Sequence, residues 1–368
     1  MSEYSRYPSL CFVNDKYYVC INQEYRHNGV SKIFILDNEF NNISSHVIPE
    51  CDYYITHNFT IFKSKNNDKY FGIGGMIRNQ HPFWVITPKG SNETKIKSAK
   101  YQNKIIQEKS GIYLLESPDL LTWTRESKPI MTVDNIPNNF IKAPRGKPYY
   151  LSSQEKRSKF ESRAPEFDSN ICCFFSHILN KYILFCRANI MKGCRSIQYT
   201  TSDDLVNWTQ FNLIKVPTFR RTYKEVWKNR RNNIANTHHH DNYYMFKCCE
   251  LLDRKIFFAL VPFTNDNISP NQHYIKKLMS YNCTDWIDLG CLLNCKMFKD
   301  EIHLNTHICE ILYHNNKLDI FLFHRCYSPN SKIRKYTFIL DETDILNQLT
   351  NLTIDKKLYT HVIEFKIE

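Results

Sequence analysis

A chain of 368 residues, of which 42% are hydrophobic and 14% aromatic, can bury a large core, which excludes an intrinsically disordered protein. It has no run of about 18 apolar residues and no signal-peptide order at its N-terminus, so we expect a cytoplasmic protein without a membrane span. The formal charge of +12 would attract an anionic partner, such as nucleic acid, an acidic polysaccharide or a membrane surface.

Five segments read, in chain order, as two strands joined by a polar turn. They are CFVNDKYYVCI from residue 11, IFKSKNNDKYFGIGG from 61, CFFSHILNKYILFCRA from 173, CCELLDRKIFFALV from 248 and EILYHNNKLDIFLF from 310. Short alternating runs of Tyr, Phe, Ile and Val, bounded by Asn, Asp, Ser and Lys, are typical of β-strands. We therefore expect a pair of antiparallel strands at each segment.

A second motif follows these strand pairs. GIYLLESPDLLTWTR at 111–125 and SIQYTTSDDLVNWTQ at 196–210 share an apolar run, Ser-x-Asp-Leu and Trp-Thr, and LMSYNCTDW at 278–286 keeps the Ser-to-Trp spacing. Two degenerate copies have Asp37 and Asp341 in place of the Ser and lack the Trp. We expect the Ser and Asp side chains to accept bonds from backbone N–H groups a residue or two ahead. The tryptophans would cover the sheet face between neighbouring repeats.

The repeat predicts the fold. A third strand before the second motif and a fourth after its Trp-Thr give four strands per unit, and such units arranged in a ring form a β-propeller. We predict an all-β chain that forms one domain, a five-bladed β-propeller with four-stranded antiparallel blades around a central axis. Its approximate blades would span 1–50, 51–135, 163–217, 232–296 and 303–368 of the single domain 1–368.

The cysteines and the basic residues can be explained without a functional role. The 14 cysteines include no Cys-x-x-Cys, so we expect buried thiols and no zinc site, the nearest metal spacing being Cys291 and Cys295. The densest basic stretch, TFRRTYKEVWKNRRNN at 218–233, carries aromatic residues as a nucleic-acid or glycan platform does. A solvated loop between strands explains it as well, and we do not expect a nucleic-acid partner.

Two segments resemble a known family. FDSNICCFFSHILNKYILFCRAN at 167–189, followed by RSIQYTTSDDLVNWT, resembles the five-bladed propellers of the glycoside hydrolase superfamily that contains families 32, 43, 62 and 68. It is most similar to uncharacterised relatives there, which also have a His-Asn-Phe element similar to THNFTIFKS at 56–64. The similarity covers about residues 50 to 215 and marks the fold rather than an activity.

The resemblance implies a glycoside hydrolase-like protein that cleaves or binds an oligosaccharide or polysaccharide, and the positive charge suits an anionic one. In that superfamily the acids lie at the axis, where the innermost strand of each blade begins. Cleavage needs two carboxylates, about 5–5.5 Å apart for retention or about 6.5–9.5 Å for inversion of configuration. The first candidate is Asp168, with Glu166 nearby. Candidates for the second acid are Asp241, Glu310, Glu250 and Glu225.

The same comparison implies the substrate contacts and shows a departure from the pattern. The candidate substrate-binding residues are His57, Asn58, Arg187, His240 and Asn305. The characterised enzymes have an acid at the start of each of the first two blades. This chain has no carboxylate between Glu3 and Asp15, and it has His57 and Asn58 in the second blade. This departure has three interpretations: the acids lie at other positions, the catalytic arrangement differs, or the protein is a non-catalytic propeller that binds glycan or protein.

No cofactor is expected. Some five-bladed relatives hold an ion on the axis, so a metal at His57, His240 or His307 is the alternative to neutral, hydrogen-bonded histidines. For Arg187 the alternative to a sugar contact is an ion pair with Asp168 or Glu166 that fixes the channel wall.

Overall fold

The structure, a computed structural model, describes most of the strand-forming sequence. The described residues are 5–23, 30–51, 55, 58–66, 68–76, 111–132, 170–191, 194–216, 241–243, 245–251, 253, 255–265, 273–294, 306–324, 331–341, 343–354 and 363–366. Among these segments, none forms a helix with the length and apolar character needed to cross a bilayer.

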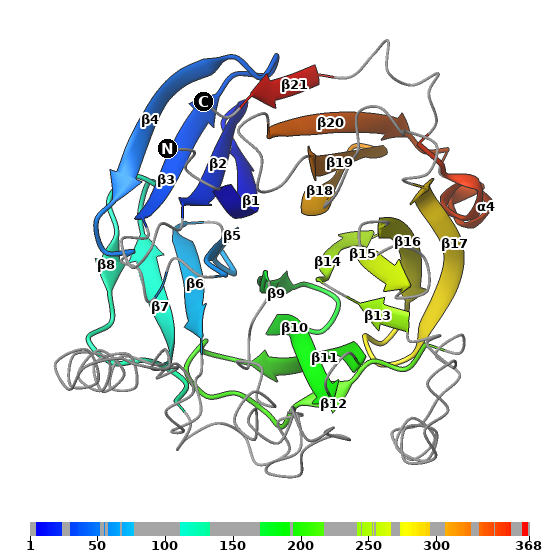
Figure 1. Cartoon of the computed structure of the whole chain (residues 1–368), viewed down its shortest axis with the longest axis horizontal. Helices are drawn as coiled ribbons and strands as arrows, with labels where there is room; N and C mark the ends of the chain where they lie inside the picture. Colours follow the sequence, from blue (N-terminus) through cyan, green and yellow to red (C-terminus); the bar gives the residue numbers. More distant parts are fainter. Residues whose placement is uncertain are drawn as a thin grey trace, which may run out of the picture.

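Five antiparallel sheets stand in a ring around a central axis, which confirms the predicted five-bladed β-propeller (Figure 1). The first two blades contain β1 (Ser5–Val13), β2 (Lys16–Gln23), β3 (Val30–Leu36) and β4 (Asn42–Ile48), then β5 (Thr60–Lys63), β6 (Tyr70–Met76), β7 (Gly111–Ser117) and β8 (Thr124–Arg125). The third contains β9 (Cys172–Ser176), β10 (Lys181–Met191), β11 (Cys194–Ser202) and β12 (Asn212–Leu213).

The last two blades depart slightly from this regularity. The fourth contains β13 (Asp241–Tyr243), β14 (Lys247–Leu251), β15 (Ile256–Asn265), β16 (His273–Ser280) and β17 (Trp286–Asn294); the fifth contains β18 (His307–His314), β19 (Lys317–His324), β20 (Lys332–Ile339) and β21 (Ile363–Lys366). Both β13 and β14 pair with β15, so the innermost strand of the fourth blade is interrupted. A short helix, α4 (Ile345–Asn351), lies on the outside of the ring against β17 (Figure 1).

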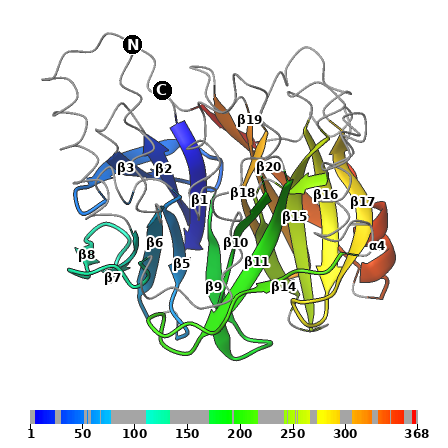
Figure 2. The same ribbon diagram turned by 60° about the horizontal axis from the view of Figure 1, so that its bottom comes forward.

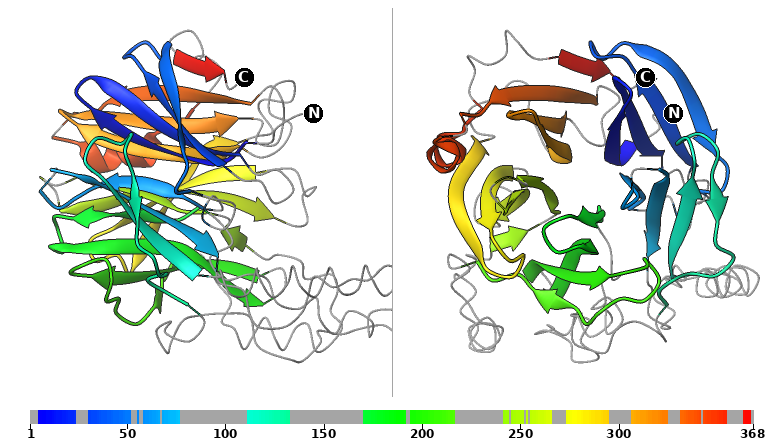
Figure 3. Two further views of the ribbon diagram at one scale, coloured as in Figure 1. Left: turned by 90° about the vertical axis from the view of Figure 1, so that its left-hand side faces the viewer. Right: turned by 180° about the vertical axis from the view of Figure 1, so that it is seen from behind.

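The innermost strands surround the axis in the order β1, β5, β9, β14 and β18, and β18 is again adjacent to β1 (Figures 2 and 3). The ring closes by side-chain packing between the first and last blades, because each of these blades is built from one stretch of the chain. Tyr17, Phe40 and Phe321 form an aromatic cluster there, with the Phe40 and Phe321 rings stacked at 5.8 Å. The Lys335 ammonium donates to the Tyr17 hydroxyl over 2.7 Å across the same interface.

The repeated Ser-x-Asp motif forms a side-chain-capped turn. In the third blade Asp204 Oδ1 accepts from the N–H groups of Val206 and Asn207 at 2.9 and 2.7 Å, while Ser202 Oγ accepts from those of Asp204 and Leu205. The backbone N–H of Asn207 is the largest cause that lowers the pKa of Asp204, to about 2. Each side-chain oxygen therefore accepts from N–H groups two and three residues ahead, whereas the sequence predicted one or two.

The degenerate copy at Asp37 keeps the same turn, whereas the copy at Asp341 leads into α4 and has a φ of −138° at Asp344. The third residue after the Ser or its Asp replacement has positive φ in four blades, at 67° for Phe40, 67° for Leu120, 66° for Leu205 and 62° for Cys283. The indole N–H of each tryptophan donates to the carbonyl of this residue, over 2.8 to 2.9 Å, in the copies that retain one. Replacement of Ser by Asp37 thus preserves the turn in the first blade.

Two of the tryptophans cover sheet faces as predicted. Trp286 in the fourth blade is 1% exposed and packs edge-on against Phe246 and against Phe185 of the third blade. Trp123 is 3% exposed and belongs to a cluster with Cys20 and Ile33 of the first blade. Trp208 is half-buried, packed against the cluster between the second and third blades.

The cysteines are mostly buried thiols, as expected. Of the described cysteines Cys291 is exposed, Cys249 is half-buried, and the rest are buried and free. Burial raises the pKa of Cys11 and Cys172 to about 12, so these thiols are protonated and unreactive at neutral pH. In the described part of the chain no group of three or more His, Cys, Asp or Glu side chains could hold a metal ion.

Candidate functional site

Buried polar side chains gather where the innermost strands begin. We call Asn58, Asn170, Arg187, Tyr243 and His307 the strand-start cluster, and each residue is at most 3% exposed. Asn58 and Asn170 lie two residues before β5 and β9, Tyr243 ends β13, and His307 begins β18. Phe185 of β10 pairs with Cys172 of β9, and the two strands are antiparallel. Arg187, two residues after Phe185, therefore lies beside Asn170, two residues before Cys172, on the strand next to the innermost one. These residues therefore occupy one end of the axis.

Asn170 connects two blades that are not neighbours. Its Nδ2 donates to the carbonyl oxygen of Pro8 over 3.2 Å, so its side chain spans from the third blade to the first. Within the described part of the chain its Oδ1 accepts no hydrogen bond, although the residue is 1% exposed. A buried amide oxygen without a donor is costly, and bound ligand hydroxyls would satisfy it.

The neighbouring polar groups are held by backbone atoms. Asn58 has a φ of 66°, which an asparagine tolerates, and its Nδ2 donates to the Gly75 carbonyl over 3.3 Å. Asn22 Nδ2 donates to the carbonyls of Tyr7 and Phe59, which joins the starts of the first two blades. Amide and hydroxyl groups fixed in this way can bind a ligand that offers many hydroxyls.

The histidine of the fifth blade is part of the same arrangement. The ring of His307 packs edge-on against Tyr7 of β1, with centroids 5.7 Å apart. Behind it, Thr306 Oγ1 lies 3.4 Å from His324 Nδ1, and the Tyr336 hydroxyl lies 3.2 Å from His324 Nε2. The axial metal considered for His307 stays untested, because His57 and His240 lie outside the described residues.

The other predicted residues divide between described and undescribed parts of the chain. Asn58 and Arg187 belong to the strand-start cluster, and their role as substrate-binding residues stays a prediction. The backbone of Asp241 begins β13 and pairs with Asn265. Candidates outside the described residues are His57, Glu166, Asp168, Glu225, His240 and Asn305, as are Cys295 and the basic stretch 218–233.

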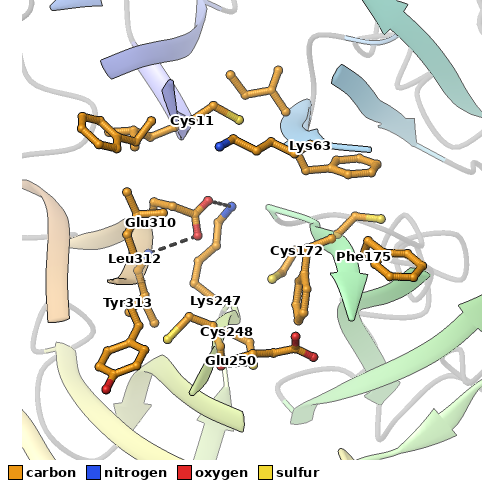
Figure 4. A pocket seen from close by; sticks show the side chains of 18 of the residues that line it. Cys11, Lys63, Cys172, Phe175, Lys247, Cys248, Glu250, Glu310, Leu312 and Tyr313 are labelled. Carbon is orange, nitrogen blue, oxygen red and sulfur yellow. Dashed lines mark hydrogen bonds and ion pairs between the residues drawn. The ribbon is translucent and has the colours of Figure 1, made fainter. Parts of the chain in front are cut away.

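Glu310 lies further along the axis than the strand starts and is already ion-paired. The Lys247 ammonium, on a residue that is 1% exposed, lies 3.3 Å from Glu310 Oε2 and donates to Thr60 Oγ1, also over 3.3 Å (Figure 4). Since Lys247 belongs to the fourth blade and Thr60 to the second, the lysine side chain crosses the axis. Its ammonium therefore joins the second, fourth and fifth blades.

The electrostatics of this pair follow from burial. Burial raises the pKa of Glu310, and the Lys247 ammonium and the Ile311 N–H offset that rise only in part. Burial is the largest single effect on Lys247 and opposes its charge, but the Glu310 carboxylate and smaller contributions from neighbouring groups together raise the pKa of the lysine. A carboxyl with a raised pKa beside a fixed cation has the character of a general acid, although its partner cation restricts its movement.

Glu250, a further candidate for the second acid, faces away from the strand starts. It sits near the end of β14, where its carboxylate accepts from the Ser176 hydroxyl and from the His177 N–H over 2.9 Å. Burial raises its pKa, and the bonds from Ser176 and His177 oppose the rise. Glu250 is therefore positioned to join the third and fourth blades rather than to reach a ligand at the strand-start cluster.

Sequence reasoning missed Lys247 and Asn170. The signal for Lys247 was present in FKCCEL, where a lysine stands at the first position of a mostly apolar strand beside the axis. For Asn170 the signal was weaker, since its partner Pro8 is 162 residues away and no local pattern indicates the bond.

The arrangement is similar to known structures at low sequence identity. A thermostable family-43 glycoside hydrolase has a TM-score of 0.52 at 10% identity, over 92% of this chain and 90% of that one. An N-acetylgalactosamine deacetylase from F. plautii, in complex with blood group B trisaccharide, has a TM-score of 0.50 at 10% identity, over 100% and 91% of the two chains. The sequence matches no protein-family model and no curated protein.

These two structures are named for different reactions, so at this identity the likeness concerns the fold and leaves the chemistry open. It agrees with the resemblance found in the sequence segments 56–64 and 167–189. The chain has the five-bladed β-propeller fold of the glycoside hydrolase propellers.

Proposed function

We propose that the protein is a glycoside hydrolase-like propeller that takes an oligosaccharide or polysaccharide at the strand-start end of its axis. The observation that supports this most is the strand-start cluster, in which amide, guanidinium, phenol and imidazole groups from different blades lie at one end of a propeller. Sugars are bound by groups of this kind, fixed in direction by the surrounding backbone. Asn170 Oδ1 would accept a hydrogen bond from a sugar hydroxyl.

Hydrolysis would fall to Asp168 and Glu166, which lie two and four residues before Asn170 in the sequence. One carboxyl would protonate the leaving oxygen, and the other would act as the nucleophile or activate water. His57, Asn58, Arg187, His240 and Asn305 would position the sugar. The +12 charge favours an acidic polymer over a neutral one.

A second candidate function is glycan or protein binding without cleavage. The ion pair of Glu310 with Lys247 favours it, because this pair commits one of the proposed axial acids to a structural contact. The lack of a carboxylate between Glu3 and Asp15 in the first blade, and Asn58 before the innermost strand of the second, favour it further.

One experiment separates the two functions. A panel of neutral and acidic glycans is incubated with the wild-type protein, Asp168→Asn, Glu166→Gln and the control Asp15→Asn, whose side chain is exposed in the turn after β1. We expect release of reducing ends by the wild type and the control, and a loss of at least about 100-fold with Asp168→Asn. Binding that survives without any release by the wild type would establish the second function, and release that persists in Asp168→Asn would reject the assigned acid.

A further inference from the structure

The axial channel contains a cavity that the proposed glycan site does not use. Its volume is about 300 Å³, at the lower end of the sizes of small-molecule sites. It is lined by residues of all five innermost strands, including Cys172 and Lys247 at the first positions of β9 and β14, and by none of the strand-start cluster (Figure 4). Lys247 and Glu310 form part of its wall.

The cavity is reached from the end of the axis where the innermost strands finish. His177, which follows β9, is exposed, and Phe12, Leu312 and Tyr313 are half-buried. The residues at the strand starts are, in contrast, almost fully buried. A small molecule would therefore enter from the side opposite to the proposed glycan.

Most of the wall is apolar. Phe12, Phe175 and Leu312 provide aromatic and aliphatic surface, and the thiols of Cys11 and Cys172 line the middle. Burial keeps these thiols protonated, so they behave as small apolar groups rather than as nucleophiles or metal ligands. Such a wall favours the hydrocarbon part of a ligand.

One positive charge in this wall has no counter-ion among the described residues. Lys63, the last residue of β5, extends its ammonium into the cavity beside Cys11 (Figure 4). Within the described part of the chain no hydrogen bond or ion pair holds the Lys63 ammonium, whereas Lys247 is neutralised by Glu310. The remaining acid, Glu250, directs its carboxylate to Ser176 and the His177 N–H on the opposite wall.

We propose that this cavity binds a small monoanion with an apolar body, of the class of medium-chain carboxylic acids. The carboxylate would pair with Lys63, and the hydrocarbon chain would lie against Phe12, Phe175 and Leu312. The volume equals that of roughly ten water molecules in the liquid, which suits a chain of about eight carbons. The inference is independent of the proposed function at the strand starts.

The test is a calorimetric titration of the full chain with octanoate, and with 1-octanol as the uncharged probe of matched length. Lys63→Met removes the cation and keeps much of the side-chain length. Lys317→Met is the matched control, because it removes an exposed lysine from the start of β19, outside the cavity lining. Leu312→Trp keeps Lys63 and fills the cavity, so it tests the position of the site even where Lys63→Met folds poorly.

We expect octanoate to bind the wild type and Lys317→Met equally, and Lys63→Met at least tenfold more weakly. Leu312→Trp should abolish octanoate binding, and 1-octanol should not distinguish the wild type from Lys63→Met. The proposal is overturned if octanoate does not bind the wild type, if Lys63→Met binds it as tightly, or if Lys317→Met loses as much affinity. Glycan binding or turnover has no bearing on these outcomes.

Discussion

At the scale of single residues, the side chain of Lys247 joins three blades across the axis. A buried ammonium is tolerated only when a counter-ion and hydrogen-bond acceptors replace the water it has lost. Glu310 provides the charge and Thr60 the acceptor, each at 3.3 Å. The lysine also lines the cavity that contains Lys63, so its loss would change the wall of that cavity.

Removing one partner of this pair should destabilise the protein strongly. We expect Lys247→Met to lower the free energy of unfolding by about 3–5 kcal/mol at neutral pH, because it leaves the Glu310 carboxylate buried without its cation. The double variant Lys247→Met/Glu310→Gln should recover much of the loss. Urea denaturation measures the free energy of unfolding of the wild type, the single variant and the double variant.

The control is Lys69→Met, which breaks the pair with Glu116. Those side chains are 40% and 48% exposed, so the expected cost is at most about 1 kcal/mol. A cost for Lys247→Met that is no larger than the cost of this control would contradict the proposed role of the buried pair.

The raised pKa of Glu310 predicts how stability depends on pH. The folded protein holds a proton on Glu310 at pH values where the unfolded chain, with a pKa of 4.5, has lost it. The stabilisation is complete below that value and is lost as the pH rises through the higher pKa of the folded state. The wild type should therefore lose stability relative to Glu310→Gln as the pH rises from 4.5 towards neutral. Paired urea titrations across this range measure the difference, and a difference that is constant or grows with pH would be the opposite result.

At the scale of the elements, the repeated turn was predictable because its contacts are local. Ser202 and Asp204 bond to N–H groups two or three residues ahead, and the Trp208 indole bonds back to the carbonyl of Leu205. The sequence spacing of the motif therefore contains the geometry of the turn. The bonds from Asn170 to Pro8 and from Lys247 to Thr60 join distant blades, and no sequence spacing indicates them.

The turn gives a prediction with an internal control. Asp204→Ala removes acceptors for two backbone N–H groups and should cost about 1–2 kcal/mol in the free energy of unfolding. Asp204→Asn should cost less, because Asn282 makes the equivalent bonds in the fourth blade, at 3.0 and 2.8 Å. Thermal or urea unfolding compares the two variants. Equal costs for Ala and Asn would mean that the side-chain acceptor does not stabilise the turn.

At the scale of the whole molecule, the number of blades followed from the number of repeats, and the ring order follows the chain order. The site was less predictable. Asn58 and Arg187 could be proposed from their resemblance to other propellers, and both lie at the strand starts. Glu310 was also proposed there, but its structural environment is the ion pair with Lys247 further along the axis. A sequence shows which residues are acidic, whereas the pairing of an acid depends on blades that meet only after folding.

The central claim is that a glycan is bound at the strand-start end, and calorimetric titration of a glycan panel tests it most directly. The proteins are the wild type, Asn170→Ala, and the control Asn212→Ala on the exposed outer strand β12. We predict that at least one glycan, acidic rather than neutral, binds the wild type and the control equally and Asn170→Ala at least tenfold more weakly. No binding across the panel, or binding that Asn170→Ala leaves unchanged, would contradict the account.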